Sequence, residues 1–194
     1  MKQFSILFFA LAALTLAFTG PVETVEVDTS DSVISWKGYK VLGSHEGTLS
    51  LKSGDLQMQD GALVGGSFVI DMGSINCTDL DGEAKGNLEG HLKSPDFFGV
   101  GDFPTATFNI TNVVSRGTAG AYKITGDLTI KKTTKPVRFN VQISEEEGQQ
   151  VAVGEVQIDR SDFDVRYGSG SFFDNLGDNT IYDEFDLGIR LVLN

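Results

Sequence analysis

The sequence contains few side chains that could act as a nucleophile, a base or a transition-metal ligand. Cys77 is the only cysteine, and His45 and His91 are the only histidines. A nucleophilic thiol needs a base beside it, so Cys77 with His91 is the one pair to consider, but nothing in the sequence activates the thiol. Metal sites need several such ligands at short spacing, and no His-x3-His or Cys-x2-Cys pattern is present. We therefore predict no catalytic residue, no metal and no cofactor.

Three acidic or glycine-rich segments near the C-terminus also fail as sites. Residues 174–178 lack the alternating carboxylates of an EF-hand calcium loop. Residues 168–171 have the glycines of a phosphate-binding loop but not its Gly-Lys-Ser/Thr. Asp162 and Asp164 have the spacing of a strand or turn, not that of a catalytic pair. We interpret all three segments as solvated turns and loops.

Composition and charge narrow the class of protein. The 194 residues include 23 Gly and 14 Phe but only 4 Pro, and a disordered chain would lack the phenylalanines. With 27 Asp+Glu against 15 Lys+Arg the net charge is −12. Binding to nucleic acid or to an anionic membrane needs a cluster of basic residues, and the sequence has none. A single cysteine excludes an internal disulfide.

The first residues have the layout of a secretory signal. Lys2 precedes an apolar run from Phe4 to Phe18, which Gly20-Pro21 follows. The run is shorter than the ~20 residues that span a bilayer. We predict a signal peptide over 1–20, a single mature domain over 21–194 and a periplasmic or secreted protein without stable membrane insertion. An uncleaved anchor is the alternative.

Apolar and polar residues alternate along most of the mature chain. The pattern is clearest over 122–131, 137–143 and 185–193, and weaker over 24–28, 32–41, 46–53, 62–72, 104–114 and 150–160. Alternation with a period of two indicates strands with one buried and one wet face, as in antiparallel sheets. About nine strands are expected, in a sandwich or a barrel.

One segment has helical spacing instead. Over 79–93, Leu80, Ala84, Leu88 and Leu92 recur every four residues and would share one face of a helix. Three glycines in this segment make the helix marginal without tertiary packing. Segments 115–120 and 168–180 are the richest in turn residues.

The aromatic residues supply a large apolar volume. The alternating pattern alone does not predict whether that volume fills a core or lines a cavity. An eight-stranded barrel either fills its interior with side chains or holds one small ligand. A packed core without a cavity and a barrel that holds a ligand both remain open at this point.

Three motifs resemble the YceI-like family. They are residues 92–98 (LKSPDFF) with Phe103-Pro104 and Phe108, residues 126–130 (GDLTI) with 134–137 (TKPV), and residues 160–163 (RSDF). Their order and spacing agree with the family over roughly residues 24–193. The sequence departs from the family pattern at Asp31, Lys132 and Asp164, where local turn geometry should differ.

The resemblance implies an all-β, extended lipocalin-like, antiparallel eight-stranded β-barrel with one short helix near the barrel mouth. It also implies a bacterial periplasmic or secreted setting and a long apolar ligand of polyisoprenoid type. We expect the lumen to be lined by Trp36, Phe68, Leu88, Leu92, Phe97, Phe98, Phe108, Tyr122, Leu128, Phe139, Phe163 and Phe185. Candidate contacts to the ligand's polar headgroup are His91, Lys93 and Arg160.

These observations favour non-enzymatic binding or carriage of a lipid, an isoprenoid or an acyl chain, with the glycine-rich helix as a gate. Two alternatives remain: a small-molecule isomerase or hydrolase at the barrel mouth, and a stress-related structural protein with a closed, dry core. The sequence leaves the oligomeric state open, a dimer included.

Overall fold

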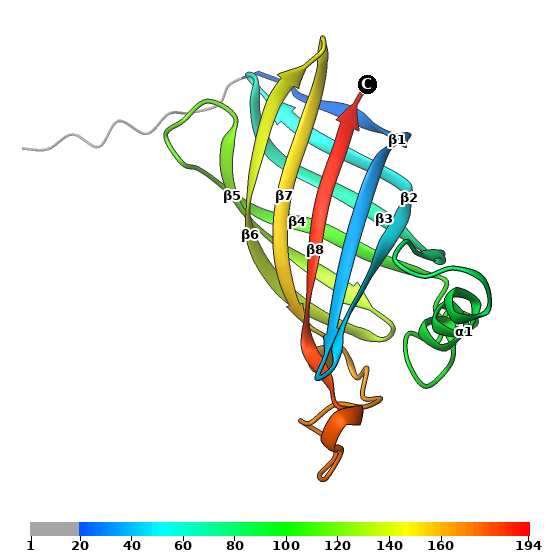
Figure 1. Cartoon of the computed structure of the whole chain (residues 1–194). Coiled ribbons are helices and arrows are strands. Elements are labelled where there is room, and N and C mark those ends of the chain that lie inside the picture. The colour runs from blue at the N-terminus through cyan, green and yellow to red at the C-terminus, as the bar shows by residue number, and fades with distance from the viewer. Residues whose placement is uncertain (1–19) are drawn as a thin grey trace, which may run out of the picture.

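A computed structural model describes residues 20–194, so the predicted signal peptide lies outside the described residues except for Gly20. Eight strands form a closed barrel in which each strand pairs antiparallel with the next and β8 pairs with β1 (Figure 1). The strands are β1 (Val22–Lys40), β2 (Gly43–Gln59), β3 (Ala62–Cys77), β4 (Thr105–Ser115), β5 (Ala121–Ile130), β6 (Thr133–Glu146), β7 (Gln149–Asp159) and β8 (Ile181–Leu193). One α-helix, α1 (Gly82–Lys93), and two short 3₁₀ helices, η1 (Arg160–Phe163) and η2 (Gly177–Asn179), complete the fold. The predicted eight-stranded barrel with one helix is confirmed.

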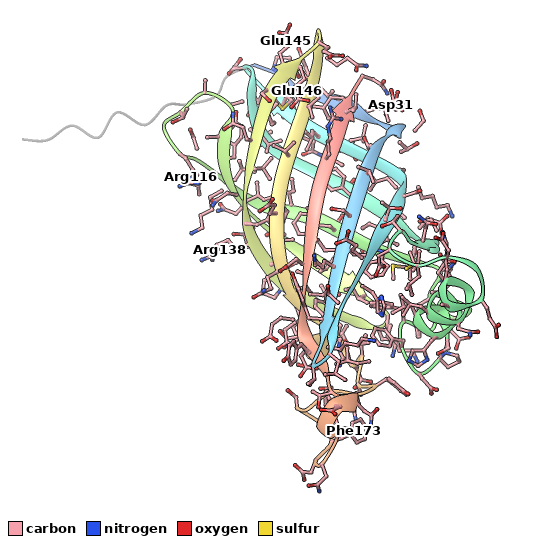
Figure 2. All side chains as sticks on the ribbon, in the orientation of Figure 1. Asp31, Arg116, Arg138, Glu145, Glu146 and Phe173 are labelled. Carbon is pink, nitrogen blue, oxygen red and sulfur yellow. The ribbon has the colours of Figure 1, made fainter. Side chains whose placement is uncertain are left out.

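Alternation along the strands places apolar side chains inside and polar ones outside. In β5, Tyr122, Ile124, Gly126, Leu128 and Ile130 are buried, while the residues that alternate with them are at least partly exposed. Figure 2 shows the charged side chains of Arg138, Glu145 and Glu146 on the outside of the barrel. The acidic net charge is therefore carried largely by the wet outer face.

The structure has eight strands where nine were expected, because the segments 24–28 and 32–41 both belong to β1. The register of β1 shifts against β2 between Glu26 and Ile34, and against β8 between Asp28 and Val33. At this bulge the Asp28 carboxylate accepts a hydrogen bond from the Ser30 amide at 2.9 Å. The local bond interrupts the alternation without ending the strand.

Several inward-pointing aromatic rings lie against glycines on the neighbouring strand. A Cβ built on Gly47 would be 2.6 Å from the Trp36 ring, and one on Gly54 would be 2.8 Å from Phe68. A Cβ on Gly126 would come within 2.3 Å of the Phe108 ring. These three glycines leave the space into which the rings pack on the neighbouring strand.

Helix α1 and the segment that follows it complete the wall where two strands separate. The register between β3 and β4 covers only Ser67–Asp71 of β3, although β3 continues to Cys77. Two bonds fix α1 beside this part of β3: the Cys77 amide donates to Glu89 Oε1 at 2.8 Å, and Lys85 Nζ donates to Asn76 Oδ1 at 2.9 Å. The helix is therefore part of the barrel wall.

The predicted helix of 79–93 begins later than expected, at Gly82. Leu80 precedes it and Ala84 is exposed, whereas Leu88 and Leu92 are partly buried. No residue of α1 is fully buried. The helix thus contacts the barrel along one narrow face that runs from Lys85 to its C-terminal end, because its other sides face solvent.

Alanine at the two central glycines of α1 is expected to stabilise the helix. Gly86 and Gly90 have no atom within 4 Å of an added Cβ, so Gly86→Ala and Gly90→Ala should each contribute about 1 kcal/mol. Amide hydrogen exchange in α1 should slow by about fivefold per substitution. Gly82→Ala is the control: Gly82 has φ +56°, a left-handed conformation that alanine disfavours, so it should not slow exchange. Unchanged exchange in both central variants would contradict the prediction.

Asp164, which replaces the family's glycine, adopts a left-handed conformation with φ +59°. Asp is among the few residues besides Gly that tolerate this region. Asp164 therefore forms the left-handed turn that ends η1.

Candidate functional site: the barrel cavity

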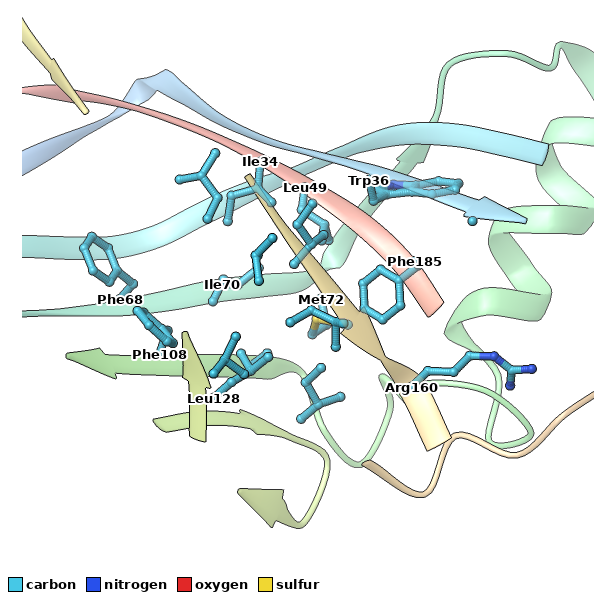
Figure 3. Close-up of a pocket in the computed structure, with 18 of the residues that line it drawn as sticks. Ile34, Trp36, Leu49, Phe68, Ile70, Met72, Phe108, Leu128, Arg160 and Phe185 are labelled. Carbon is cyan, nitrogen blue, oxygen red and sulfur yellow. The ribbon is translucent and has the colours of Figure 1, made fainter. Parts of the chain in front are cut away.

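The barrel encloses a cavity of about 330 Å³, within the usual range for small-molecule sites (Figure 3). All eight strands contribute to its wall, together with α1 and the segment after it. Most of the lining side chains are aliphatic or aromatic, among them Ile34, Leu49, Phe68, Ile70, Met72, Ala106, Phe108, Leu128, Phe139, Val156, Phe185 and Leu187. The interior is therefore suited to apolar groups.

The cavity is long, and its two ends differ. On β8 its lining runs from Ile181 to Leu191, roughly 33 Å of strand at about 3.3 Å per residue. Leu56 and Leu63 at one end are each only 3% exposed. At the other end the lining includes Lys40 and Tyr182, which are exposed. The cavity is thus a deep tube with a mouth between the β1–β2 hairpin, α1 and the loop before β8.

Two buried nitrogen atoms in lining residues have no hydrogen-bond partner within residues 20–194. They are Trp36 Nε1 and His91 Nε2. The His91 ring packs edge-on against Tyr167, with centroids 4.3 Å apart, and against Phe97 at 5.7 Å. A buried polar atom without a partner costs about 1–3 kcal/mol. An acceptor oxygen on a ligand would satisfy the Trp36 indole, which can only donate.

Arg160 contacts the cavity, but its guanidinium is occupied elsewhere. Arg160 is 3% exposed, and its nitrogens donate to the carbonyl oxygens of Val165, Ile181 and Tyr182 at 2.7, 2.9 and 3.1 Å. Nη2 also lies 3.2 Å from the Asp183 carboxylate. Burial lowers the pKa of Arg160, and the charges of Asp183 and Asp159 oppose that shift. Arg160 therefore holds the loop before β8 onto the end of the barrel.

The single cysteine belongs to a hydrogen-bonded cluster where β3 leads into α1. Asp79 accepts from Cys77 Sγ at 3.1 Å and from the Glu46 amide at 3.0 Å, and its other oxygen lies 2.9 Å from His45 Nδ1. Burial, and then the bond to Asp79, raise the pKa of the Cys77 thiol. Burial alone would raise the pKa of Asp79 as well, but these three hydrogen bonds outweigh it and hold that pKa below its usual range. The arrangement keeps the thiol protonated, which does not suit a nucleophile.

The lowered pKa of Asp79 predicts how this cluster responds to acid. A carboxyl whose pKa is depressed on folding stabilises the protein above its unfolded value, near 3.8, and loses that contribution as pH falls through the folded value. Asp79→Asn should therefore be less stable than wild type at neutral pH, and the difference should shrink below about pH 3.8. Urea unfolding at a series of pH values measures it.

Asp81→Asn is the matched control for that series. Asp81 occupies the N-cap of α1 without a side-chain capping bond, so its replacement should change stability little. A stability difference for Asp79→Asn that does not depend on pH would contradict the prediction.

The structure brings most of the expected lumen residues together. Those that line the cavity are Trp36, Phe68, Leu88, Leu92, Phe97, Phe98, Phe108, Leu128, Phe139 and Phe185. Two others do not: Tyr122 is buried and its hydroxyl accepts from the Leu63 amide at 3.3 Å, and Phe163 is buried in η1. Among the expected headgroup contacts, His91 and Arg160 line the cavity and Lys93 does not. Ligand contact at these positions stays a prediction.

Most of the aliphatic residues that line the cavity were not predicted from the sequence. Ile70 and Met72 share the parity of Phe68 in one alternating segment, so their inward direction was available from the sequence. Leu51 and Leu56 lie on opposite sides of a register shift in β2. Across that shift, the alternation of residues does not predict which side chains point into the barrel.

Within the part of the chain that the structure describes, no group of three His, Cys, Asp or Glu residues could hold a metal ion. No helix among residues 20–194 has the length and apolar character needed to cross a membrane.

Fold and cavity together define a closed antiparallel barrel with an apolar interior suited to one ligand. The sequence of residues 25–193 matches the family model of the YceI-like domain. The chain therefore belongs to the YceI-like family.

Individual proteins of similar sequence or structure share low sequence identity with this chain. A UPF0312 protein of Vibrio campbellii is 26% identical over 175 residues, which cover 84% of this chain and 88% of the relative. The crystal structure of Burkholderia cenocepacia BcnA has a TM-score of 0.70 at 24% identity and covers 87% of this chain and 99% of its own. A polyisoprenoid binding domain from Saccharophagus degradans has a TM-score of 0.63 at 13% identity, over 88% of this chain and 97% of its own. At these identities the two structures show the fold.

Proposed function

We propose that this protein binds the apolar chain of a lipid, of polyisoprenoid or similar type, in its barrel and carries it without chemical change. The observation that carries the proposal is the tube itself, which is apolar along its length and open at one end. A polyisoprenoid binding domain among the structures with this fold supports the choice of ligand class.

The shape of the cavity favours a chain over a compact ring system. In closed barrels the strands tilt by about 35–45°, so roughly 33 Å of β8 corresponds to about 25 Å along the barrel axis. Each buried CH₂ contributes ~0.8 kcal/mol, so even part of a long chain binds well after the costs of ordering it. One methylene more or less changes affinity little, so the polar end of the ligand must supply much of the specificity.

The polar end lies at the mouth in this proposal. An oxygen on the ligand would accept a hydrogen bond from Trp36 Nε1 or His91 Nε2, which have no partner within residues 20–194. Arg160 is less suited to this role, because carbonyl oxygens and Asp183 already occupy its nitrogens. Helix α1 is the gate in this proposal, since it closes the wall beside the mouth with no fully buried residue.

The N-terminal sequence supports export. Lys2 and the apolar run up to Phe18 have the layout of a signal peptide, which would place the carrier in the periplasm or outside the cell.

Native mass spectrometry of the protein purified without detergent tests lipid binding. The expected result is a mass above that of the polypeptide that organic extraction removes, with the extract containing a long-chain hydrophobe. A barrel that purifies empty and takes up neither a prenyl alcohol nor a fatty alcohol would overturn the proposal. Chemical conversion of either probe by the protein would instead support an enzyme at the mouth.

A further inference from the structure

Exposed apolar side chains are concentrated at the open end of the barrel. Among residues 20–194 the exposed aromatic side chains are Tyr167, Phe172, Phe173 and Tyr182, between 39% and 50% accessible. All four lie in or directly after the loop between η1 and β8. Val41 and Leu42, 42% and 73% exposed, form the tip of the β1–β2 hairpin. We call these six residues the apolar rim.

The two segments that carry the rim adjoin each other at the mouth. The Val41 amide donates to the Thr180 carbonyl at 3.3 Å, and the Ile181 amide donates to that of Gly168 at 2.8 Å, so hairpin and loop are joined. Tyr182 lines the cavity, and Tyr167 packs on His91, which also lines it. The hairpin tip and the loop lie side by side at one end of the barrel in Figure 1, and Figure 2 shows Phe173 on that loop, beyond the end of the barrel.

Polar and cation–π contacts fix the loop that carries these rings. Arg160 fastens the loop through Val165, Ile181 and Tyr182, and the Arg166 guanidinium lies 4.7 Å from the centre of the Phe172 ring. Contiguous exposed apolar surface rimmed by polar residues marks a site of interaction with a protein or a membrane. Amphipathic aromatic rings suit the interface between water and lipid.

Charge decides which lipid surface fits. Residues 164–180 carry Asp164, Asp174 and Asp178 against Arg166 alone, and the whole chain carries −12. Lys40 beside the hairpin tip and Lys131, which donates to the Asp164 carbonyl, add positive charge at this end. An anionic surface would still repel the chain as a whole, whereas a zwitterionic one presents no net charge to it.

We propose that the apolar rim docks transiently on a zwitterionic bilayer surface, and that a lipid passes between bilayer and cavity through this contact. The inference rests on the proposed function for its cargo, because the mouth inside the rim is the way into the apolar tube. Direct contact spares the lipid chain a passage through water.

Flotation of the protein with vesicles tests docking without any cargo. We expect the protein to float with vesicles of phosphatidylcholine and to float less with an equimolar mixture of phosphatidylcholine and phosphatidylglycerol. Phe173→Ser should weaken partitioning by about fivefold, since roughly half of that ring is exposed and available to the lipid. Leu42→Ser should weaken it as well, while Val114→Ser, which removes a 51% exposed side chain near the closed end, should have no effect.

Transfer of a pyrene-labelled fatty alcohol from vesicles to the protein tests the route. The transfer rate should rise in proportion to the concentration of phosphatidylcholine vesicles, as a collision requires. Phe173→Ser should reduce that rate by about fivefold and leave the final occupancy unchanged.

The outcomes separate this inference from lipid binding itself. Probe that enters the barrel at a rate independent of vesicle concentration, or equally fast in Phe173→Ser, would overturn docking and leave the lipid cavity in place. Probe that never enters, while the protein still floats with phosphatidylcholine, would overturn the cavity's function and leave docking supported. Absence of flotation with phosphatidylcholine, or flotation only with the anionic mixture, would overturn docking and point to another partner for the rim.

Discussion

Ala106→Phe is expected to weaken lipid binding by about two orders of magnitude while the barrel stays folded. Ala106 lies on β4 opposite Ile70, is 6% exposed and lines the cavity together with Ile70 and Phe108. A phenyl ring at this position would occupy space that a lipid chain needs. Displacing about four methylenes at ~0.8 kcal/mol each removes roughly 3 kcal/mol, so affinity should fall by about two orders of magnitude.

Native mass spectrometry of Ala106→Phe should therefore show the polypeptide without bound lipid. Asn109→Phe adds the same ring on the exposed side of the same strand and should keep the ligand. Overpacking could instead unfold the variant, and near-UV circular dichroism detects that case. Ala152→Phe, from the wall at β7, is then the second blocking variant. Full occupancy in a folded Ala106→Phe barrel would show that the ligand binds elsewhere.

Arg160→Met is expected to destabilise the protein by about 3–5 kcal/mol. The substitution keeps most of the apolar stem but leaves the carbonyls of Val165 and Ile181 without their donor and the Asp183 carboxylate without its ion-pair partner. For a domain of this size the melting temperature should fall by about 10 °C. Amides of residues 164–180 should lose their protection against hydrogen exchange first, because Arg160 fixes that loop.

Arg166→Met provides the comparison for Arg160→Met. Arg166 also pairs with an aspartate and lies over an aromatic ring, but its side chain is 57% exposed, so its loss should change stability by less than about 1 kcal/mol. A stable Arg160→Met protein that fails to bind lipid would restore Arg160 as a headgroup contact, the role that the sequence suggested.

Much of the fold could be predicted because its causes are local. Alternation along 122–131 and 185–193 reports directly which side chains enter the barrel, and β5 and β8 occupy those segments. The four-residue spacing of leucines located α1. Three motifs identified the family, although pattern alone left a filled core and a cavity equally open.

The remainder depends on contacts between distant segments. Leu51 and Leu56 both point into the barrel although they are five residues apart, because the register of β2 against β3 shifts between them. The alternation within one strand cannot predict a shift in its pairing with another strand. Arg160 looked like a free cation because the carbonyls that occupy it lie as far away in sequence as Tyr182. Phe163 and Tyr122 have the residue types of a lumen wall, but they are buried in other parts of the core.

A cavity with one mouth fixes the direction in which a ligand enters and leaves. Because Leu56 and Leu63 close the far end, a chain must enter with its apolar tip first and leave with its polar end first. In this proposal the cavity holds one chain, so the outgoing molecule must depart before the next one enters. An incoming lipid should then be unable to displace the bound one. Any recipient at the mouth would always meet the cargo in the same orientation.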